Sequence, residues 1–335
     1  MELLKKLSDT HGISGNEGDV RDIIRKQIKK YVDSITIDKM GNLIAYRKGK
    51  DPQIMLASHM DEVGLMVKKI LNNGRICLTD IGGVAIDLLI GQKVQILGDK
   101  GKVRGVVSHP EVASGKELKK VPPMSSMRVD TGLKKKELEK LGIHIGSYVR
   151  FDQKSFTKGN KITGKALDNR IGCYILLEVA KKLKTKNGVY FVFTVQEEMG
   201  LYGAKTSAFH IEPDWAIVVD VSQANDSLEE PTLSLGKGPT ITAKDGEFIA
   251  NKCIREWLAT VAKKNKIPYQ LEVCDEGTTD ATNISTTRGG IPSAVLGVAI
   301  RNMHSSISIA DIIDIRNAIK MLTIGLKNPP ISCLV

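Results

Sequence analysis

The sequence predicts an α/β protein in which a mostly parallel sheet, covered by helices, is interrupted by a small inserted β domain. From about residue 163 onward, amphipathic helical segments alternate with near-continuous apolar strands, the pattern of a sheet buried on both faces. Between residues 65 and 162, glycines recur around short alternating stretches, which is typical of a small β domain. We therefore expect one α/β domain made of residues 1–64 and 163–335, with residues 65–162 inserted.

The N-terminal part is expected to contain two helices, a hairpin and a buried strand. Residues 2–9 and 17–32 carry apolar residues at helical spacing. The stretch "SITIDKMGNLIAYRKG" alternates apolar and polar residues around Gly41-Asn42, which favours a β-hairpin. The apolar run at 53–58 is short and bounded by polar residues, so it indicates a buried strand.

After the inserted domain, the periodicity predicts alternating strands and helices. We expect helices at 168–184, 200–208, 247–265 and 308–326, and strands at 189–195, 215–221 and 294–300. This alternation is the signal for the parallel sheet.

Composition argues against nucleic acid and membrane as partners. The formal net charge is +11, but the lysines flank apolar residues at helical spacing, as on a solvated amphipathic face. Aromatic residues make up only 4%, which leaves little material for stacking bases. No apolar stretch approaches the roughly 18 residues of a membrane span.

The compartment expected from the sequence is the cytoplasm. The first residues, "MELLKKLSDTHG", lack the apolar core and cleavage site of a signal peptide. The five cysteines are odd in number and form no CxxC motif, so reduced thiols are expected rather than a disulfide framework.

Polar residues with metal-binding side chains follow the predicted strands. The carboxyl ends of strands in an open α/β sheet line the crevice where ligands bind, so these side chains should converge. Taken singly, a histidine after a strand is more often structural, and Asp168 could simply be a helix-terminal charge. The case depends on several such residues at equivalent positions, namely His59, Asp61, Asp168, Glu197, Glu198, Asp220 and His304.

Imidazole and carboxylate without cysteine form the ligand set of hydrolytic zinc, cobalt or manganese sites. Clustered carboxylates repel one another, and two divalent cations would offset that repulsion, polarise a carbonyl and generate hydroxide from water. Of the adjacent Glu197 and Glu198, one can be a ligand while the other moves the proton. Asp61 is well placed to accept the second imidazole N–H of His59.

Six motifs along the chain stand out together: "SHMDEVGLMV" (58–67), "GKALDNRIG" (164–172), "VQEEMGLYGA" (195–204), "VVDVS" (218–222), "GTTDATN" (277–283) and "RNMHSS" (301–306). In order and spacing they resemble the tetrahedral aminopeptidase family, which includes glutamyl and deblocking aminopeptidases and some members labelled endoglucanase. The resemblance extends over nearly the whole chain, including the insert.

The resemblance implies a zinc-peptidase-like catalytic domain holding two divalent metal ions. His59 and Asp220 would bind one ion, Glu198 and His304 the other, and Asp168 would bridge them. Glu197 would act as general base for the attacking hydroxide, and Asp61 would support His59. Asp280 in the "GTTDA" loop would lie near the substrate.

The resemblance also implies partners and assembly. Substrates would be short peptides with a free amino terminus. The insert would be a small barrel-like or PDZ-like dimerisation domain, and dimers would assemble into a tetrahedral dodecamer.

Other hydrolases remain alternatives at this stage. A related metallo-carboxypeptidase, dipeptidase or deacylase would use the same metals on another substrate. A glucan hydrolase would need only two carboxylates across a sugar and no metal, so the two histidines count against it.

Overall fold

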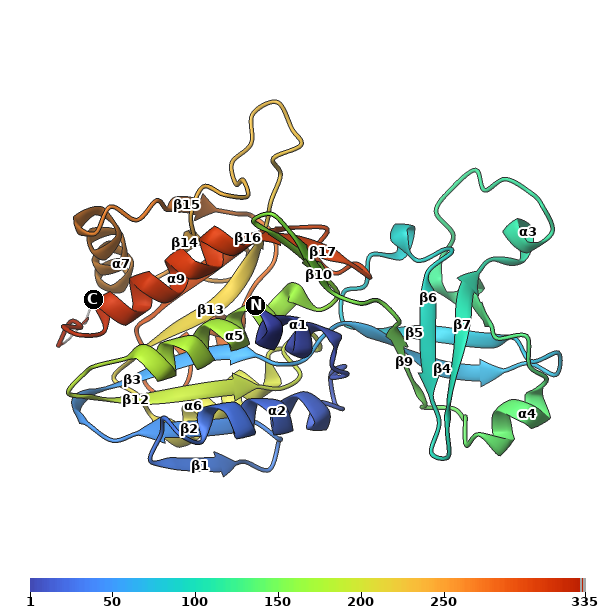
Figure 1. Ribbon diagram of the computed structural model, residues 1–335, viewed down its shortest axis with the longest axis horizontal. Coiled ribbons are helices and arrows are strands. Elements are labelled where there is room, and N and C mark those ends of the chain that lie inside the picture. Colours follow the sequence, from blue (N-terminus) through green and yellow to red (C-terminus); the bar gives the residue numbers. More distant parts are fainter. Residues whose placement is uncertain (332, 334–335) are drawn as a thin grey trace.

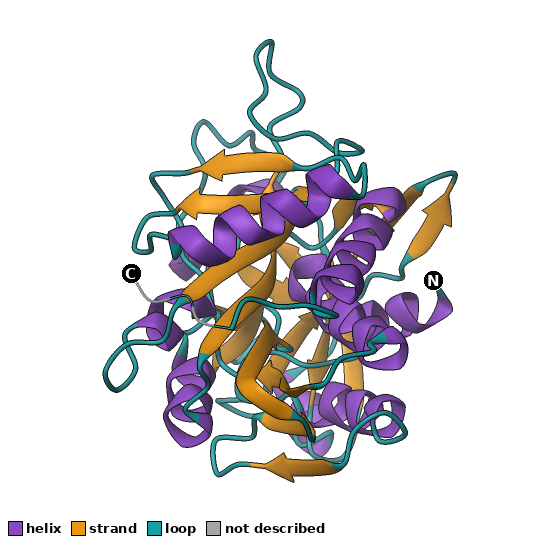
Figure 2. Ribbon diagram, turned by 90° about the vertical axis from the view of Figure 1, so that its left-hand side faces the viewer, coloured by secondary structure: helices purple, strands orange, loops and turns teal. Residues whose placement is uncertain are grey.

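The computed structural model, which describes residues 1–331 and 333, has two lobes, an α/β lobe and a β-barrel (Figure 1). Residues 332, 334 and 335, the end of the predicted catalytic domain, lie outside the described residues. The α/β lobe contains an 11-stranded sheet, and helices lie on both sides of it (Figure 2). The predicted fold class is confirmed.

The large sheet is mixed, with a parallel centre and antiparallel flanks. Strands β12, β3, β13 and β16 are mutually parallel, whereas the strands on either side of them run antiparallel to their neighbours. In spatial order the strands are β1 (Ser34–Ile37), β2 (Leu43–Arg47), β12 (Asn187–Thr194), β3 (Lys50–His59), β13 (Trp215–Gln223), β16 (Ser293–Arg301), β17 (Ser308–Asp311), β11 (Lys161–Gly164) and β10 (Phe156–Lys158), with β14 (Thr240–Lys244) on β16 and β15 (Gln270–Val273) on β14.

Helices cover both faces of the parallel strands, and therefore β13 is buried from Trp215 to Ser222. The helices that pack around α5 cover one face; they are α1 (Glu2–Asp9), α2 (Gly18–Ile28), α5 (Leu167–Lys182) and α9 (Ile312–Gly325). The other face carries α6 (Tyr202–Ile211) and α8 (Asp280–Ser285), while α7 (Lys252–Lys264) packs against α9 and β14.

The closing helix begins later than predicted. Residues 308–311 form β17, which pairs with β16 and β11, and α9 starts only at Ile312. The Asp311 side chain caps α9 by accepting a 2.7 Å hydrogen bond from the Ile313 amide. Strand pairing with distant segments therefore overrides the local helical periodicity.

The second lobe is a closed antiparallel barrel with its own hydrophobic core. Its strands are β4 (Gly64–Ile70), β5 (Ile76–Ile81), β8 (Arg128–Asp130), β7 (Lys102–Ser108), β6 (Lys93–Leu97) and β9 (Tyr148–Phe151). Its connections carry η1 (Ile86–Leu88), α3 (Pro110–Ala113), η2 (Met124–Ser126) and α4 (Lys135–Lys140). Because β10 already pairs with β11 in the large sheet, we propose that the inserted domain ends between Phe151 and Phe156, before the predicted boundary at 162.

Two cysteines differ from the sequence-based expectation of reduced thiols. Cys253 on α7 and Cys333 form a disulfide that joins residues separated by 80 positions. Cys77, Cys173 and Cys274 are free. The spacing of these cysteines could not reveal the pair, because the bond depends on the chain returning to α7 after α9. The cysteines therefore no longer support a reducing compartment.

Within the described part of the chain, no helix combines the length and apolar character that crossing a bilayer requires.

A buried ion cluster holds the segment that follows His59. Glu62 accepts from Lys165 Nζ at 2.6 Å and from Arg170 at 3.3 Å, and all three side chains are buried. Arg170 Nε also donates to the Met60 carbonyl at 2.9 Å. Because buried charges are tolerated only when paired, this cluster fixes the path of the chain directly after β3.

Candidate metal centre and active site

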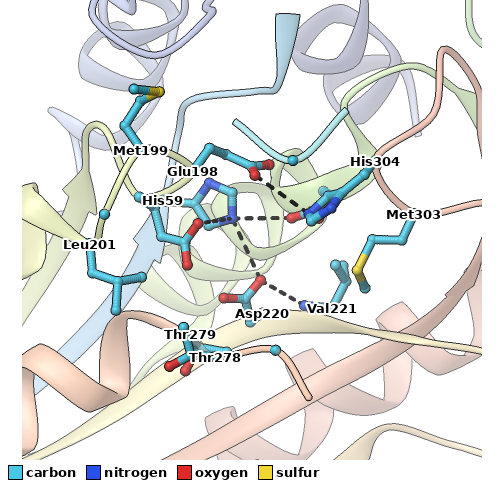
Figure 3. Close-up of a pocket in the computed structure, with 15 residues that line it drawn as sticks. His59, Glu198, Met199, Leu201, Asp220, Val221, Thr278, Thr279, Met303 and His304 are labelled. Atoms are coloured by element: carbon cyan, nitrogen blue, oxygen red, sulfur yellow. Dashed lines mark hydrogen bonds and ion pairs between the residues drawn. The ribbon is translucent and has the colours of Figure 1, made fainter. Parts of the chain in front are cut away.

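The residues predicted to form a site converge at the edge of the sheet that faces the barrel. The parallel strands place them there, because their carboxyl ends lie at one edge. A cavity of about 430 Å³ opens at this edge (Figure 3). Its lining includes His59, Asp168, Glu197, Glu198, Asp220 and His304.

Each residue reaches the site from a different element. His59 is the last residue of β3, and Asp220 lies within β13. Asp168 lies in the first turn of α5, and His304 follows β16 by three residues with a left-handed backbone (φ 57°). Glu198 lies in the turn between β12 and α6. No local stretch could assemble this group without the fold.

Asp168 lies between the two imidazoles. Its Oδ1 is 3.1 Å from His59 Nε2, and its Oδ2 is 3.4 Å from His304 Nε2. Glu198 Oε2 is also 3.4 Å from His304 Nε2, while Asp220 Oδ1 is 3.7 Å from His59 Nε2. The geometry therefore pairs Asp220 with His59 and Glu198 with His304, with one oxygen of Asp168 toward each histidine.

Asp61 anchors both His59 and the glutamate pair. Its Oδ1 lies 3.5 Å from His59 Nδ1 and accepts a 3.1 Å hydrogen bond from the Glu197 amide. Its Oδ2 accepts from the Glu198 amide at 3.2 Å and from Ser14 Oγ at 2.6 Å. Sequence reasoning expected the contact with His59 but missed the two backbone bonds, which position the Glu197–Glu198 turn.

A loop of the barrel closes on the site, which sequence reasoning also missed. The Ala85 amide donates a 3.0 Å hydrogen bond to the His304 carbonyl. A Cβ on Gly83 would lie 3.1 Å from His304 Nδ1, and one on Gly82 (φ 76°) would lie 3.0 Å from Glu198 Cβ. The adjacent glycines are the one local signal for this close approach.

Asp280 does not line the cavity, although its loop does. Thr278 and Thr279 are at the wall, whereas Asp280 is fully buried. Its Oδ2 accepts a 2.5 Å hydrogen bond from Thr194 Oγ1 at the end of β12. Asp280 thus lies directly behind the wall residue Thr279, at the first residue of α8, and its role near the substrate stays a prediction.

Burial and mutual repulsion disfavour ionisation of the site carboxylates. Burial raises the pKa of Glu197 well above its ordinary value, and Asp280, Glu198 and Asp220 add to the rise. Burial, with the charge of Asp168, raises the pKa of Glu198 to about 8. Burial also raises the pKa of Asp220.

The imidazoles respond in the opposite sense to the same surroundings. The hydrogen bond with Asp168 raises the pKa of His304 to about 9. Burial alone would lower the pKa of His59, but the surrounding carboxylates, with Glu197 the largest contributor, raise it well above its ordinary value. Burial likewise opposes ionisation of Asp168, yet its hydrogen bonds to His304 and His59 hold its pKa far below the usual range. Protons or cations therefore stabilise this cluster of carboxylates.

The donor set fits divalent cations. Ligand atoms of His59, Asp168 and Glu198 lie within 4.8 Å of one another, and so do those of His59, Glu197 and Asp220. Glu198 Oε1 is buried and has no hydrogen-bond partner among the described residues. Nitrogen and oxygen donors of this kind suit zinc, cobalt or manganese.

The metal-free protein is expected to lose stability as the pH rises from about 6 to 9. Folding raises the pKa of Glu198 from 4.5 to about 8 and that of His304 from 6.5 to about 9. Over this interval these two groups hold more protons in the folded state than in the unfolded state, so their contribution to the free energy of unfolding falls as pH rises. Lys165, whose pKa is lowered by burial from 10.5 to about 8, opposes this fall only above about pH 8. Thermal unfolding with chelator should show a melting temperature lower by several degrees at pH 9 than at pH 6.

Added Mn²⁺ or Zn²⁺ should reduce that loss, because cations supply the charge that the protons otherwise provide. A melting temperature that is independent of pH in chelator, or falls equally with and without metal, would contradict this account of the cluster.

Comparison with known proteins gives consistent matches along the chain. Residues 41–321 match the family model described as M42 glutamyl aminopeptidase. The lysyl aminopeptidase of Pyrococcus furiosus is 37% identical over 96% of this chain and 94% of its own.

Solved structures match over nearly the full length as well. An aminopeptidase from the archaeon Desulfurococcus kamchatkensis superimposes with a TM-score of 0.93 at 38% identity, over 98% of this chain and 94% of its own. The TET1 peptidase of Pyrococcus horikoshii, described as able to assemble into a tetrahedron or a large octahedral shell, gives a TM-score of 0.87 at 31% identity, over 97% of this chain and 98% of its own.

Proposed function

The chain belongs to the family of M42 glutamyl aminopeptidases, and from this premise we propose that it is a dinuclear metal-dependent aminopeptidase that removes N-terminal residues from short peptides. Membership of the family makes it a peptide hydrolase and confirms the resemblance seen in the motifs. We propose, beyond this family membership, the number and identity of the metals and the roles of the individual residues.

One observation carries the proposal above the others. The two oxygens of Asp168 face two different histidines, and each histidine has a second carboxylate beside it. This arrangement is what a carboxylate bridging two cations requires. His59 and Asp220 would hold one ion, Glu198 and His304 the other, and Asp168 both.

When bound, divalent cations polarise the scissile carbonyl and lower the pKa of water. Glu197 takes a proton from the attacking water and passes it to the leaving amine, so it serves as general base and then general acid. Asp61 keeps Glu197 in place through the backbone and orients the His59 ring.

The cavity lining disfavours the carboxy terminus of a peptide. An α-carboxylate needs a cationic side chain to bind it. Among the described residues, the cavity lining includes no lysine or arginine. This counts against the carboxypeptidase alternative, and the two histidines of the cluster count against a glucan hydrolase, which needs only two carboxylates.

An assay with amino-acid anilides tests the proposal. Purified protein treated with chelator should not cleave them, and added Zn²⁺, Co²⁺ or Mn²⁺ should restore cleavage. The N-acetylated forms of the same substrates should stay intact, because they lack the free amine. Cleavage that resists chelator, or preference for acetylated substrates, would overturn the aminopeptidase assignment.

We also propose that the barrel mediates dimerisation and that dimers form a larger closed shell. The architecture shared with the Pyrococcus horikoshii peptidase supports this. A monomeric mass by light scattering would contradict it.

A further inference from the structure

Four apolar residues line the cavity on two sides of the proposed metal ligands, and together they are called the apolar wall. In the view of Figure 3, Met199 and Leu201 lie on one side of the imidazole and carboxylate groups, and Val221 and Met303 lie on the other. Leu201 and Val221 are each only 8% exposed, so their shape is fixed by packing. Methionine side chains adapt readily to aliphatic groups of different shape.

The backbone of this wall is held in place on both sides. Asn283 Nδ2 donates a 2.9 Å hydrogen bond to the Leu201 carbonyl. The Met303 amide donates a 3.1 Å hydrogen bond to Gln223 Oε1. The wall is thus a preformed surface rather than a loose loop, as expected for a small-molecule pocket.

The remaining polar groups of the lining are neutral. Thr278 and Thr279 contribute hydroxyl groups, and the Thr278 hydroxyl is hydrogen-bonded to Thr282 at 2.6 Å. No lysine or arginine among the described residues lines the cavity, so a glutamate side chain would have no cationic partner.

A lysine side chain would also lack a dedicated partner. The carboxylates in the lining are the four that belong to the metal cluster, Asp168, Glu197, Glu198 and Asp220. Two divalent cations would balance their charge, leaving little net field for a basic side chain. Asp280 is buried outside this lining, and its Oδ2 accepts a hydrogen bond from Thr194.

We propose that the enzyme prefers peptides whose N-terminal residue is neutral and aliphatic, such as leucine or methionine, to those that begin with glutamate or lysine. This inference rests on the proposed aminopeptidase function and specifies its substrate class. It sets the chain apart from the glutamyl label of the family and the lysyl label of its relative, because the described lining has no lysine or arginine and no carboxylate outside the metal cluster.

The direct test ranks kcat/KM for leucyl, methionyl, glutamyl and lysyl p-nitroanilides with the metal-loaded protein. Leucyl or methionyl substrate should exceed both charged substrates by at least about tenfold. A glutamyl or lysyl substrate that equals or exceeds them would overturn the inference and leave the aminopeptidase proposal standing. Failure to cleave any of the four with any metal would overturn both.

A charge placed in the wall tests its location. Met303→Arg should raise the ratio of glutamyl to leucyl kcat/KM by at least about tenfold, since the guanidinium offers the missing partner. Ser34→Arg adds the same charge at an exposed position on edge strand β1 and should leave the ratio unchanged. An unchanged ratio in Met303→Arg, or an equal shift in Ser34→Arg, would overturn the assignment of the wall to the first residue.

Discussion

Replacing Glu197 with glutamine is expected to lower kcat/KM by roughly 10²–10⁴-fold, the usual contribution of a general base. Glutamine keeps the size of the side chain and its backbone bond to Asp61, but it cannot accept and return a proton. The amount of bound metal should stay the same, because the proposed ligands are all intact. Steady-state kinetics and elemental analysis of the same preparation measure both quantities.

The amount of bound metal distinguishes two roles of Glu197, general base and metal ligand. The ligand atoms of Glu197 lie close enough to His59 and Asp220 to hold an ion themselves. If Glu197→Gln loses metal together with activity, Glu197 is a ligand and its assignment as base is wrong. Glu139→Gln, an exposed position on α4 in the barrel, removes the same charge far from the cavity and should alter neither quantity.

The parallel centre of the fold could be predicted because its strands are apolar throughout. The runs at 53–58, 215–221 and 294–300 correspond to β3, β13 and β16. Burial on both faces requires such runs, so the pattern is strong even without a partner strand in view. The polar residues that interrupt or follow them, His59 and Asp220 among them, were candidates for the same reason.

The flanks of the sheet could not be predicted in the same way. Strands β14, β15 and β17 have four or five residues each, and their pairing depends on neighbours that arrive from elsewhere in the chain. Short segments of mixed polarity take their conformation from tertiary context rather than from local preference. Residues 308–311 are an example: their local periodicity predicts helix, but pairing with β16 makes them strand β17.

Contacts between distant segments could not be predicted from the sequence either. The bond between Cys253 and Cys333 and the approach of Gly83 to His304 both join parts of the chain that no spacing rule connects. A third long-range contact matters for the chemistry of the site: the Asp61 carboxylate accepts hydrogen bonds from the amides of Glu197 and Glu198. A side chain that contacts backbone leaves no residue-type pattern on its partner, so only the fold reveals it.

Replacing Asp168 with asparagine is expected to remove most of the bound metal, whereas His304→Ala should remove about half. Asp168 faces both histidines, so its loss weakens both proposed ion sites, while His304 serves one. Asparagine preserves the shape of the side chain and removes only its charge and one oxygen. Bound metal per chain, measured after gel filtration, distinguishes the two variants.

The comparison between these variants tests whether two ions share one carboxylate. His210→Ala, at an exposed position on α6, supplies the matched histidine control and should retain full metal. Circular dichroism confirms that each variant is folded, which matters because an uncompensated buried charge destabilises. Equal partial losses in Asp168→Asn and His304→Ala would mean that Asp168 serves a single ion. Full retention in Asp168→Asn would place the cations elsewhere, and the short distances from Asp168 to both imidazoles would then be ordinary ion pairs.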